Sequence, residues 1–412
     1  MFTFTSRALP AVIVAALMSL ASSPALAQLR QHVRLQELTP LPEEAFSPLD
    51  GQRQDNQFGG SVVIRNGLAF IGMPAAMTTG EVAVFTQRTT GWVRTATIFA
   101  SDKTTDDGFG QAISFRDGLL VVGSSRAAYV YKQISGVWRE RQKIVPPAAD
   151  RVDTFSGLKH EAGVLAIAAR AAGNIGLRDS VYVFEQDANG RFVRSARLIP
   201  STDPRAGFGS SIDMTSRIIV IGSFAGSAYV FGRNSSGKWV QRQKLLAPSR
   251  TNAGDGYGRV VAVDNHMILV AAPEAPSDDD NSGQVHVFLP GATQYVEAFK
   301  LPLPGGRGFG TVMAISDKYI AVGAPSVPFT EDNPPGSVTT YLREGSSVRP
   351  LGFFEDSGPR TARVPISIGI ANNLLLVGSP FDESCSHWDE SCEHTGINIG
   401  EANLVRLNQF KP

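Results

Sequence analysis

Apolar positions recur in a fixed order along most of the chain. After Phe109–Gly110 there is an apolar segment, a polar turn and an unbroken apolar run that ends at Gly123. A short unbroken apolar run between turns is typical of a strand that is buried on both faces. Alternating apolar residues follow at 127–131, and a last strand is predicted over 138–144. The order predicts four short strands joined by turns.

The same order occurs seven times. In each copy an apolar run ends 14 residues after an aromatic or equivalent position, and successive copies start 46 to 55 residues apart. This period is too long for leucine-rich or ankyrin units and fits a four-stranded propeller blade. The copies start at Phe58, Phe109, Phe155, Phe208, Tyr257, Phe309 and Val364. We therefore predict an all-β, seven-bladed β-propeller with four-stranded antiparallel blades.

The repeated units resemble FG-GAP repeats, which are named for their Phe-Gly and Gly-Ala-Pro segments. Phe208–Gly209 supplies the first segment, and Gly323–Pro325 supplies the second intact. The resemblance extends from residue 58 to about residue 407. It implies a propeller similar to the head of integrin α subunits and to many exported bacterial proteins. Calcium-binding members carry an Asp-x-Asp-x-Asp-Gly-like loop between the first two strands. A short turn such as Asn66–Gly67 stands there instead, which argues against calcium in these turns.

The ends of the chain are predicted to close the ring. The expected outer strands are 92–98, 138–144, 192–198, 239–245, 295–301 and 348–354. The seventh unit lacks such a strand, since the chain ends soon after its third strand, 402–407. The missing copy is at the other end, in His32–Leu38. We expect these two segments to pair antiparallel, because the pairing removes two exposed sheet edges.

Long loops are expected on one face of the propeller. Strand direction alternates within a blade, so the connections into first strands share a face with those between second and third strands. We call this the loop face, and the opposite one the turn face. The loops after the second strand are long in units 5, 6 and 7, at 272–282, 324–335 and 379–399. Long loops on a rigid scaffold often carry binding function, although tolerated insertions are an alternative. The candidate ligand-contacting residues are Asp278, Asp279, Asp280, Glu331, Asp332, Asp382, Glu383, Trp388, Asp389 and Glu390.

The charges of the loop face are unevenly distributed. The span 260–299 has six acidic residues and no Lys or Arg, and no basic residue occurs between Arg363 and Arg406. Units 2 to 4 instead place Arg126, Arg170, Arg178, Arg205 and Arg250 in or beside loops of the same face. Such a field steers association and orientation. We predict a partner that is cationic, or is bridged by divalent cations, where it meets the acidic loops.

A tandem duplication in the seventh loop contains both cysteines. The segment 382–387 is repeated as 389–394, which places Cys385 and Cys392 beside His387 and His394. Two Cys and two His are a possible zinc set. An exported pair that closes a small loop is more simply a disulfide, and this is our prediction. The histidines with nearby carboxylates, and the oxygen ligands of Asp278–Asp280, are the alternative cation sites. No cofactor is expected.

Residues 1–27 have the layout of a secretory signal peptide. Arg7 precedes an apolar stretch, 8–20, and the segment ends in Ala25–Ala27. A membrane anchor is the alternative, but the stretch contains Pro10 and is shorter than the roughly 18 to 20 residues that span a bilayer. We expect cleavage before Gln28, a single propeller domain over 28–412 with no membrane span, and a periplasmic or secreted location.

Composition limits the possible functions. The 38 basic and 38 acidic residues of the chain balance, which excludes a generally basic nucleic-acid binder. No G-x-S-x-G nucleophile motif occurs. We predict a monomeric, non-enzymatic binding module for a protein or glycan of the cell envelope. One alternative is a lectin, since Trp92, Trp138 and Trp239 recur at one strand position. The other is a hydrolase or lyase of extracellular polymers, which needs ionisable side chains clustered in the central funnel.

Overall fold

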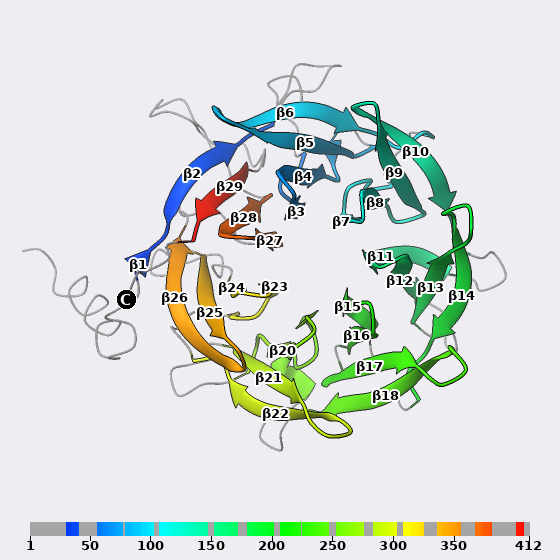
Figure 1. Cartoon of the computed structure of the whole chain (residues 1–412), viewed down its shortest axis with the longest axis vertical. Coiled ribbons are helices and arrows are strands. Elements are labelled where there is room, and N and C mark those ends of the chain that lie inside the picture. The colour runs from blue at the N-terminus through cyan, green and yellow to red at the C-terminus, as the bar shows by residue number, and fades with distance from the viewer. Residues whose placement is uncertain are drawn as a thin grey trace, which may run out of the picture.

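The computed structural model describes a closed ring of seven blades around a central axis (Figure 1). Each blade is an antiparallel sheet of four strands that runs from the axis to the rim. The fold prediction is therefore confirmed. The described residues are 30–40, 56–76, 79–102, 107–146, 152–171, 179–201, 207–223, 225–246, 253–275, 283–302, 308–324, 336–355, 367–380 and 401–407.

The strands follow the predicted repeat. Blade 1 contains β3 (Ser61–Arg65), β4 (Leu68–Met73), β5 (Glu81–Arg88) and β6 (Gly91–Ile98). Blade 2 contains β7 (Ala112–Arg116), β8 (Leu119–Gly123), β9 (Ala128–Ile134) and β10 (Val137–Ile144). Blade 3 contains β11 (Val152–Glu161), β12 (Val164–Ala171), β13 (Ser180–Gln186) and β14 (Phe192–Leu198). Blade 4 contains β15 (Phe208–Met214), β16 (Ile218–Ser223), β17 (Ser227–Arg233) and β18 (Trp239–Leu246).

The remaining blades complete the ring. Blade 5 contains β19 (Val261–Val263), β20 (Ile268–Ala272), β21 (Gln284–Pro290) and β22 (Tyr295–Lys300), and a 3-10 turn, Ala253–Asp255, precedes it. Blade 6 contains β23 (Val312–Ile315), β24 (Tyr319–Ala324), β25 (Ser337–Glu344) and β26 (Ser347–Glu355). Blade 7 contains β27 (Ser367–Ala371), β28 (Leu374–Ser379), β29 (Glu401–Arg406) and the N-terminal β2 (Val33–Leu38). The short β1 (Arg30–Gln31) adds to blade 6.

The core is divided among the seven interfaces between neighbouring blades, each of which contains one apolar cluster. Each second strand contributes side chains to two clusters, one on each face of its blade. In β8, Leu120 and Val122 pack toward blade 1, and Val121 packs toward blade 3. The unbroken apolar runs thus mark strands that are buried on both faces, as predicted.

The ring closes through the N-terminal strand, as predicted. β2 pairs antiparallel with β29, with Val33 opposite Arg406 and Leu38 opposite Ala402. β1 pairs in parallel with β26 of blade 6, which the sequence did not indicate. Between β1 and β2, the buried His32 lies against Thr340, with 2.6 Å between Nε2 and Oγ1. The N-terminal segment therefore joins two blades.

Glutamine side chains connect the outer strands of neighbouring blades. The Gln36 amide accepts a hydrogen bond from the Trp92 backbone N–H and donates one to its carbonyl, both at 2.8 Å. Gln142 makes the same pair of bonds with Phe192, and Gln243 makes it with Tyr295. The aromatic residue that starts an outer strand is thus held by the preceding blade at three interfaces: 7 to 1, 2 to 3 and 4 to 5.

Blade 3 departs from the repeat at its first strand. In the other described units with a Phe-Gly or Tyr-Gly pair, the glycine has a positive φ, for example 98° at Gly110. Unit 3 has Ser156 in that position, and β11 runs without such a turn from Val152 through Phe155 to Glu161. The strand is longer here because a serine does not favour the left-handed conformation that turns the chain.

Candidate functional site

A cavity of about 330 Å³ lies on the axis and is lined by the first strands of all seven blades. More than half of the lining residues are apolar, for example Ile113 and Ile212. Charged side chains enter the lining near the turn face, where first strands end, at Arg65, Arg116, Lys159, Glu161 and Asp213. We call the last four of these the channel cluster.

The channel cluster consists of ion pairs between neighbouring blades. The Arg116 guanidinium of blade 2 lies 2.9 Å from the Glu161 carboxylate of blade 3. The Lys159 ammonium of blade 3 lies 3.7 Å from the Asp213 carboxylate of blade 4. Asp213 also accepts a 2.8 Å hydrogen bond from the Val263 backbone N–H of blade 5. Two cations and two carboxylates thus link four successive first strands.

A neutral histidine lies beneath this cluster. His160 is buried, and its Nε2 lies 3.1 Å from the Arg116 carbonyl oxygen. A carbonyl only accepts, so Nε2 carries the proton, and Nδ1 accepts from the Ser114 hydroxyl at 2.9 Å. Burial lowers the pKa of His160 to about 4. The imidazole therefore fastens blade 3 to blade 2 in its uncharged form.

Within the channel cluster, Glu161 is the carboxylate whose pKa is raised. Partial burial raises its pKa, the Arg116 cation opposes this, and the negative charges of Asp117 and Asp213 add to the increase. A carboxyl of raised pKa near a second carboxylate is the type of pair that acid–base catalysis uses. Both carboxylates are already engaged in ion pairs, so the arrangement also serves to hold the blades together.

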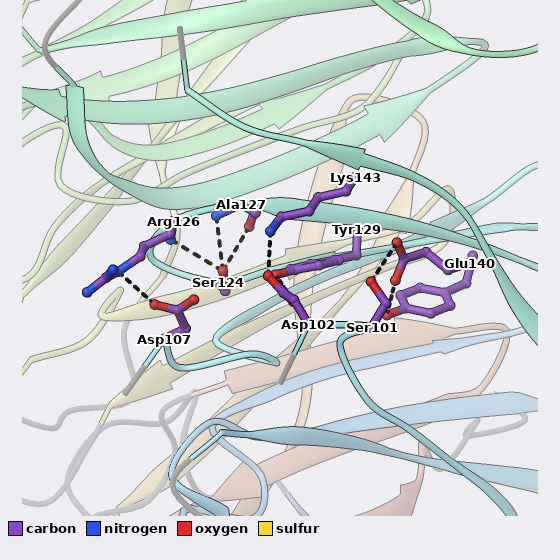
Figure 2. Close-up of polar contacts among 10 residues, drawn as sticks. Ser101, Asp102, Asp107, Ser124, Arg126, Ala127, Tyr129, Glu140 and Lys143 are labelled. Carbon is purple, nitrogen blue, oxygen red and sulfur yellow. Dashed lines mark hydrogen bonds and ion pairs between the residues drawn. The ribbon is translucent and has the colours of Figure 1, made fainter. Parts of the chain in front are cut away.

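A second polar cluster lies on the loop-face side, around residues 99–102 and 107, between the last strand of blade 1 and the first strand of blade 2 (Figure 2). Asp102 accepts a 2.8 Å hydrogen bond from the Tyr129 hydroxyl and pairs with Lys143. The Lys143 ammonium also lies 5.5 Å from the centre of the Tyr129 ring. Burial, followed by the bond to Asp102, raises the pKa of Tyr129. The same tyrosine and cation pair occurs as Tyr182 with Arg197 and as Tyr229 with Lys244.

The inner end of this connection is also held. The Arg126 guanidinium lies 2.8 Å from the carboxylate of Asp107, whose side chain is only 5% exposed (Figure 2). The Ser124 hydroxyl accepts from the backbone N–H of Ala127 at 3.0 Å and caps the turn. Arg126, which the sequence placed among the basic residues of the loop face, is thus paired with an acid of that face. Arg170 is exposed.

The candidate ligand-contacting loops lie outside the described residues. This applies to Asp278, Asp279, Asp280, Glu331, Asp332, Asp382, Glu383, Trp388, Asp389 and Glu390, and to Cys385, Cys392, His387 and His394. Their roles, the disulfide included, stay predictions. Within the described ranges, no three His, Cys, Asp or Glu side chains converge on a common point as metal ligands would. In the same part of the chain, no helix is long and apolar enough to span a membrane.

The recurrent tryptophans are packing residues. Trp92 is 6% exposed, and the ring of Trp138 packs edge-on against Phe70 at 5.4 Å. Trp239 lies under the Arg233 guanidinium at 4.7 Å and donates a 3.1 Å hydrogen bond to Glu185. All three start outer strands, as expected, but they fill the spaces between blades. They do not provide the open aromatic surfaces that the lectin alternative would use.

Sequence reasoning missed the channel cluster. Its members lie far apart in the chain and on the first strands of three different blades. Only the curvature of the ring brings these strands together around one axis. One signal was available, because Arg65 and Arg116 both end the first strand of their units, seven residues after the aromatic position. A charged residue in that position is oriented toward the turn-face end of the axis.

Comparison with known proteins supports the repeat assignment. The family model of the FG-GAP repeat matches residues 92–134 and 239–288. The chain contains FG-GAP repeats. Each matched segment begins on an outer strand and ends on or beside the third strand of the following blade, so the two FG-GAP matches cross the 1 to 2 and 4 to 5 interfaces. No curated protein sequence matches the chain.

Solved propellers share the fold. The WD40 β-propeller domain of Doa1 is similar with a TM-score of 0.56 at 10% identity, and the match covers 92% of this chain and 98% of that domain. A protein named as a candidate 6-phosphogluconolactonase from Bacteroides fragilis has a TM-score of 0.50 at 12% identity. The match covers 74% of this chain and 84% of that protein. At these identities the likeness shows a common architecture alone.

Proposed function

We propose that this protein is an exported, non-enzymatic binding module that holds a protein or glycan of the cell envelope on its loop face. The observation that carries the proposal is the grouping of its long connections. The strand ends Ala272, Ala324 and Ser379 belong to three adjacent blades, and each leads into one of the long loops. The FG-GAP propeller fold is consistent with a binding module.

The charge of these loops supports a partner of opposite sign. The connections after Ala272 and Ser379 contain most of the carboxylates of their blades, in spans that lack Lys and Arg. We propose that the partner is cationic, or is bridged by divalent cations, at residues 278–280 and 382–393. Association should then be fast at low ionic strength and slower as salt rises.

The test is to neutralise the acidic loops. The variant changes Asp278, Asp279, Asp280, Asp382, Asp389 to Asn and Glu383, Glu390 to Gln, and its binding to envelope extracts is measured at low and high salt. We expect weaker binding with a smaller salt dependence. The control replaces exposed acids of the turn face, Asp317→Asn and Glu344→Gln. Binding that is equal in parent, variant and control would refute the proposal.

A polymer hydrolase or lyase is the second candidate, because the channel cluster supplies the ionisable side chains that this function needs. Glu161 and Asp213 would be its acid and base. The test incubates the protein with polysaccharides and measures new reducing or unsaturated ends. Activity that is lost in Glu161→Gln at unchanged melting temperature would favour the enzyme. If the parent protein releases no new ends from any polysaccharide, the enzyme hypothesis is rejected and the binding module is retained.

A further inference from the structure

Positive charge is concentrated in one half of the ring. Residues 128–246, from β9 to β18, contain 17 Lys and Arg against 9 Asp and Glu. Residues 247–412 contain 11 against 19. The balanced total therefore hides an excess of eight positive charges in residues 128–246 and of eight negative charges in residues 247–412.

Much of this positive charge lies on the rim. The outer strands β10, β14 and β18 follow one another along one side of the ring (Figure 1). Exposed cations lie on these strands or in the hairpins that lead to them. They are Lys132, Arg139, Arg141, Arg191, Arg194, Lys238 and Arg242, which we call the basic arc.

The acids beside the basic arc already have partners outside it. Glu140 accepts from Ser101 at 3.1 Å, and Glu185 pairs with Arg233 at 3.1 Å. Asp187 accepts two backbone hydrogen bonds that cap its own turn, at 2.8 and 2.9 Å. In the described part of the chain, no carboxylate lies within ion-pair distance of Lys132, Arg139, Arg141, Arg191 or Lys238.

One pair in the arc opposes the stability of its own hairpin. Lys132 and Arg139 are directly opposite each other in the β9–β10 ladder, and both are exposed. Like charges in this arrangement destabilise a hairpin, whereas an acid in either position would stabilise it. A bound anion would relieve the repulsion. The hairpin is therefore better suited to a complex with an anionic ligand than to the free protein.

The shape of the arc favours a flexible chain as the ligand. Three blades present their cations on a convex rim, and a flat bilayer would touch only a small part of it. Single-stranded nucleic acid usually stacks its bases on exposed aromatic rings. Along the arc the exposed apolar side chains are aliphatic, as at Val137 and Val193, while Trp138 and Phe192 pack between blades.

We propose that the basic arc binds an acidic polysaccharide, whose carboxylate or sulfate groups contact the cations of β10, β14 and β18 in succession. This surface is separate from the loop face, so the proposal goes beyond the function proposed above. The two sites would allow the protein to hold an acidic glycan on one side and a partner of opposite charge on the other. The contacts are electrostatic and exposed, so salt should weaken them strongly.

The experiment uses the full chain and defined polymers. Binding of fractionated polygalacturonate and of heparin is measured by titration calorimetry at about 0.05 M and about 0.5 M NaCl, which differ severalfold in screening length. The variant Lys132→Gln, Arg139→Gln, Arg141→Gln removes three charges from the arc. The control Arg88→Gln, Lys300→Gln, Lys318→Gln removes three exposed charges elsewhere. Melting temperatures establish that both variants fold.

We expect the parent and the control to bind at least one polymer at low salt and to lose it at high salt. The arc variant should bind at least about fivefold more weakly, as three exposed ion pairs imply. Equal affinity of arc variant and control would overturn the proposal. So would binding to anionic phosphatidylglycerol vesicles or to single-stranded DNA in preference to both polysaccharides. Binding of envelope extracts through the acidic loops is measured separately and is not affected by these outcomes.

Discussion

Glycines define this fold at the scale of single residues. The backbone N–H of the glycine in the Phe-Gly pair donates to the carbonyl of the residue at which the apolar run of the second strand ends, for example Gly59 to Gly72 at 3.1 Å. This bond fixes the 14-residue offset that identified the repeat. The terminal glycine also faces the next blade, where a Cβ on Gly72 would overlap the Gly110 carbonyl oxygen. Two backbones thus cross at the interface with no room for a side chain.

Gly72→Ala should destabilise the propeller by at least about 2 kcal/mol, because neither backbone is free to move without opening the interface. Gly157→Ala is the matched control, since a Cβ there meets no atom within 4 Å. It should change the free energy of unfolding by less than about 0.5 kcal/mol. Chemical denaturation measures both. Similar values for the two variants would contradict the role given to the crossing.

Buried histidines make the stability of the fold dependent on pH. Burial lowers the pKa of both His32 and His160 to about 4. Between about pH 6.5 and pH 4 the unfolded chain binds protons at these imidazoles and the folded chain does not, so stability falls as pH falls. The loss approaches about 3 kcal/mol for each histidine at the lower limit.

The pH dependence is tested by replacing His160. The free energy of unfolding of His160→Gln should fall less steeply than that of the parent between about pH 6.5 and pH 4, because one proton-binding site of the unfolded chain is gone. The exposed His266 provides the control, and His266→Gln should keep the parent's slope. A slope that is unchanged in His160→Gln would show that this histidine is protonated in the folded state.

At the scale of elements, the glutamine connections explain how neighbouring sheets keep their register. Each sheet has its own hydrogen-bonded ladder, and the apolar interfaces are not directional. The paired bonds of Gln142 to the Phe192 backbone are directional, and they join outer strands where the blades diverge. They set the height of one blade against the next.

Gln142→Glu should weaken the connection while preserving side-chain size. A carboxylate still accepts from the Phe192 N–H but faces the Phe192 carbonyl oxygen without a proton to donate. We expect a loss of about 1 to 3 kcal/mol at neutral pH, the cost of leaving a partly buried polar group unpaired. Gln133→Glu, at the exposed end of β9, should change stability little. Urea unfolding of the two variants at neutral pH makes the comparison.

The strands were predictable because each one follows from apolar and polar positions that are neighbours in the sequence. The six expected outer strands and the apolar second strands all formed within one or two residues of their predicted ends. The glutamine connections and the channel cluster were not predictable in this way. Gln142 and Phe192 are 50 residues apart in the chain, and Lys159 and Asp213 are similarly distant. In the sequence, Gln142, Lys159 and Asp213 each look like an ordinary polar residue of a strand.

At the scale of the whole molecule, the ring places the basic and the acidic parts of the sequence on different blades. Blades 2 to 4 and blades 5 to 7 lie on different sides of the axis, so the strands of the basic span and those of the acidic span are separated in space (Figure 1). Screening confines each field to about 8 Å at physiological salt. The two sides should therefore act independently, each on the ligand that contacts it.

Closure of the ring depends on the N-terminal strand, and its removal is the strongest test of the architecture. Deleting residues 28–40 exposes the edges of β29 and β26, removes the buried Leu38 side chain and breaks the Gln36 connection to blade 1. We expect the melting temperature to fall by at least about 5 °C, and the open edges to promote association between molecules. Deletion of 408–412, beyond β29, is the control. If the shortened chain melted at the parent temperature and remained monomeric in light scattering, the first and last blades would be held by their apolar interface alone, and the strand would be dispensable for closure.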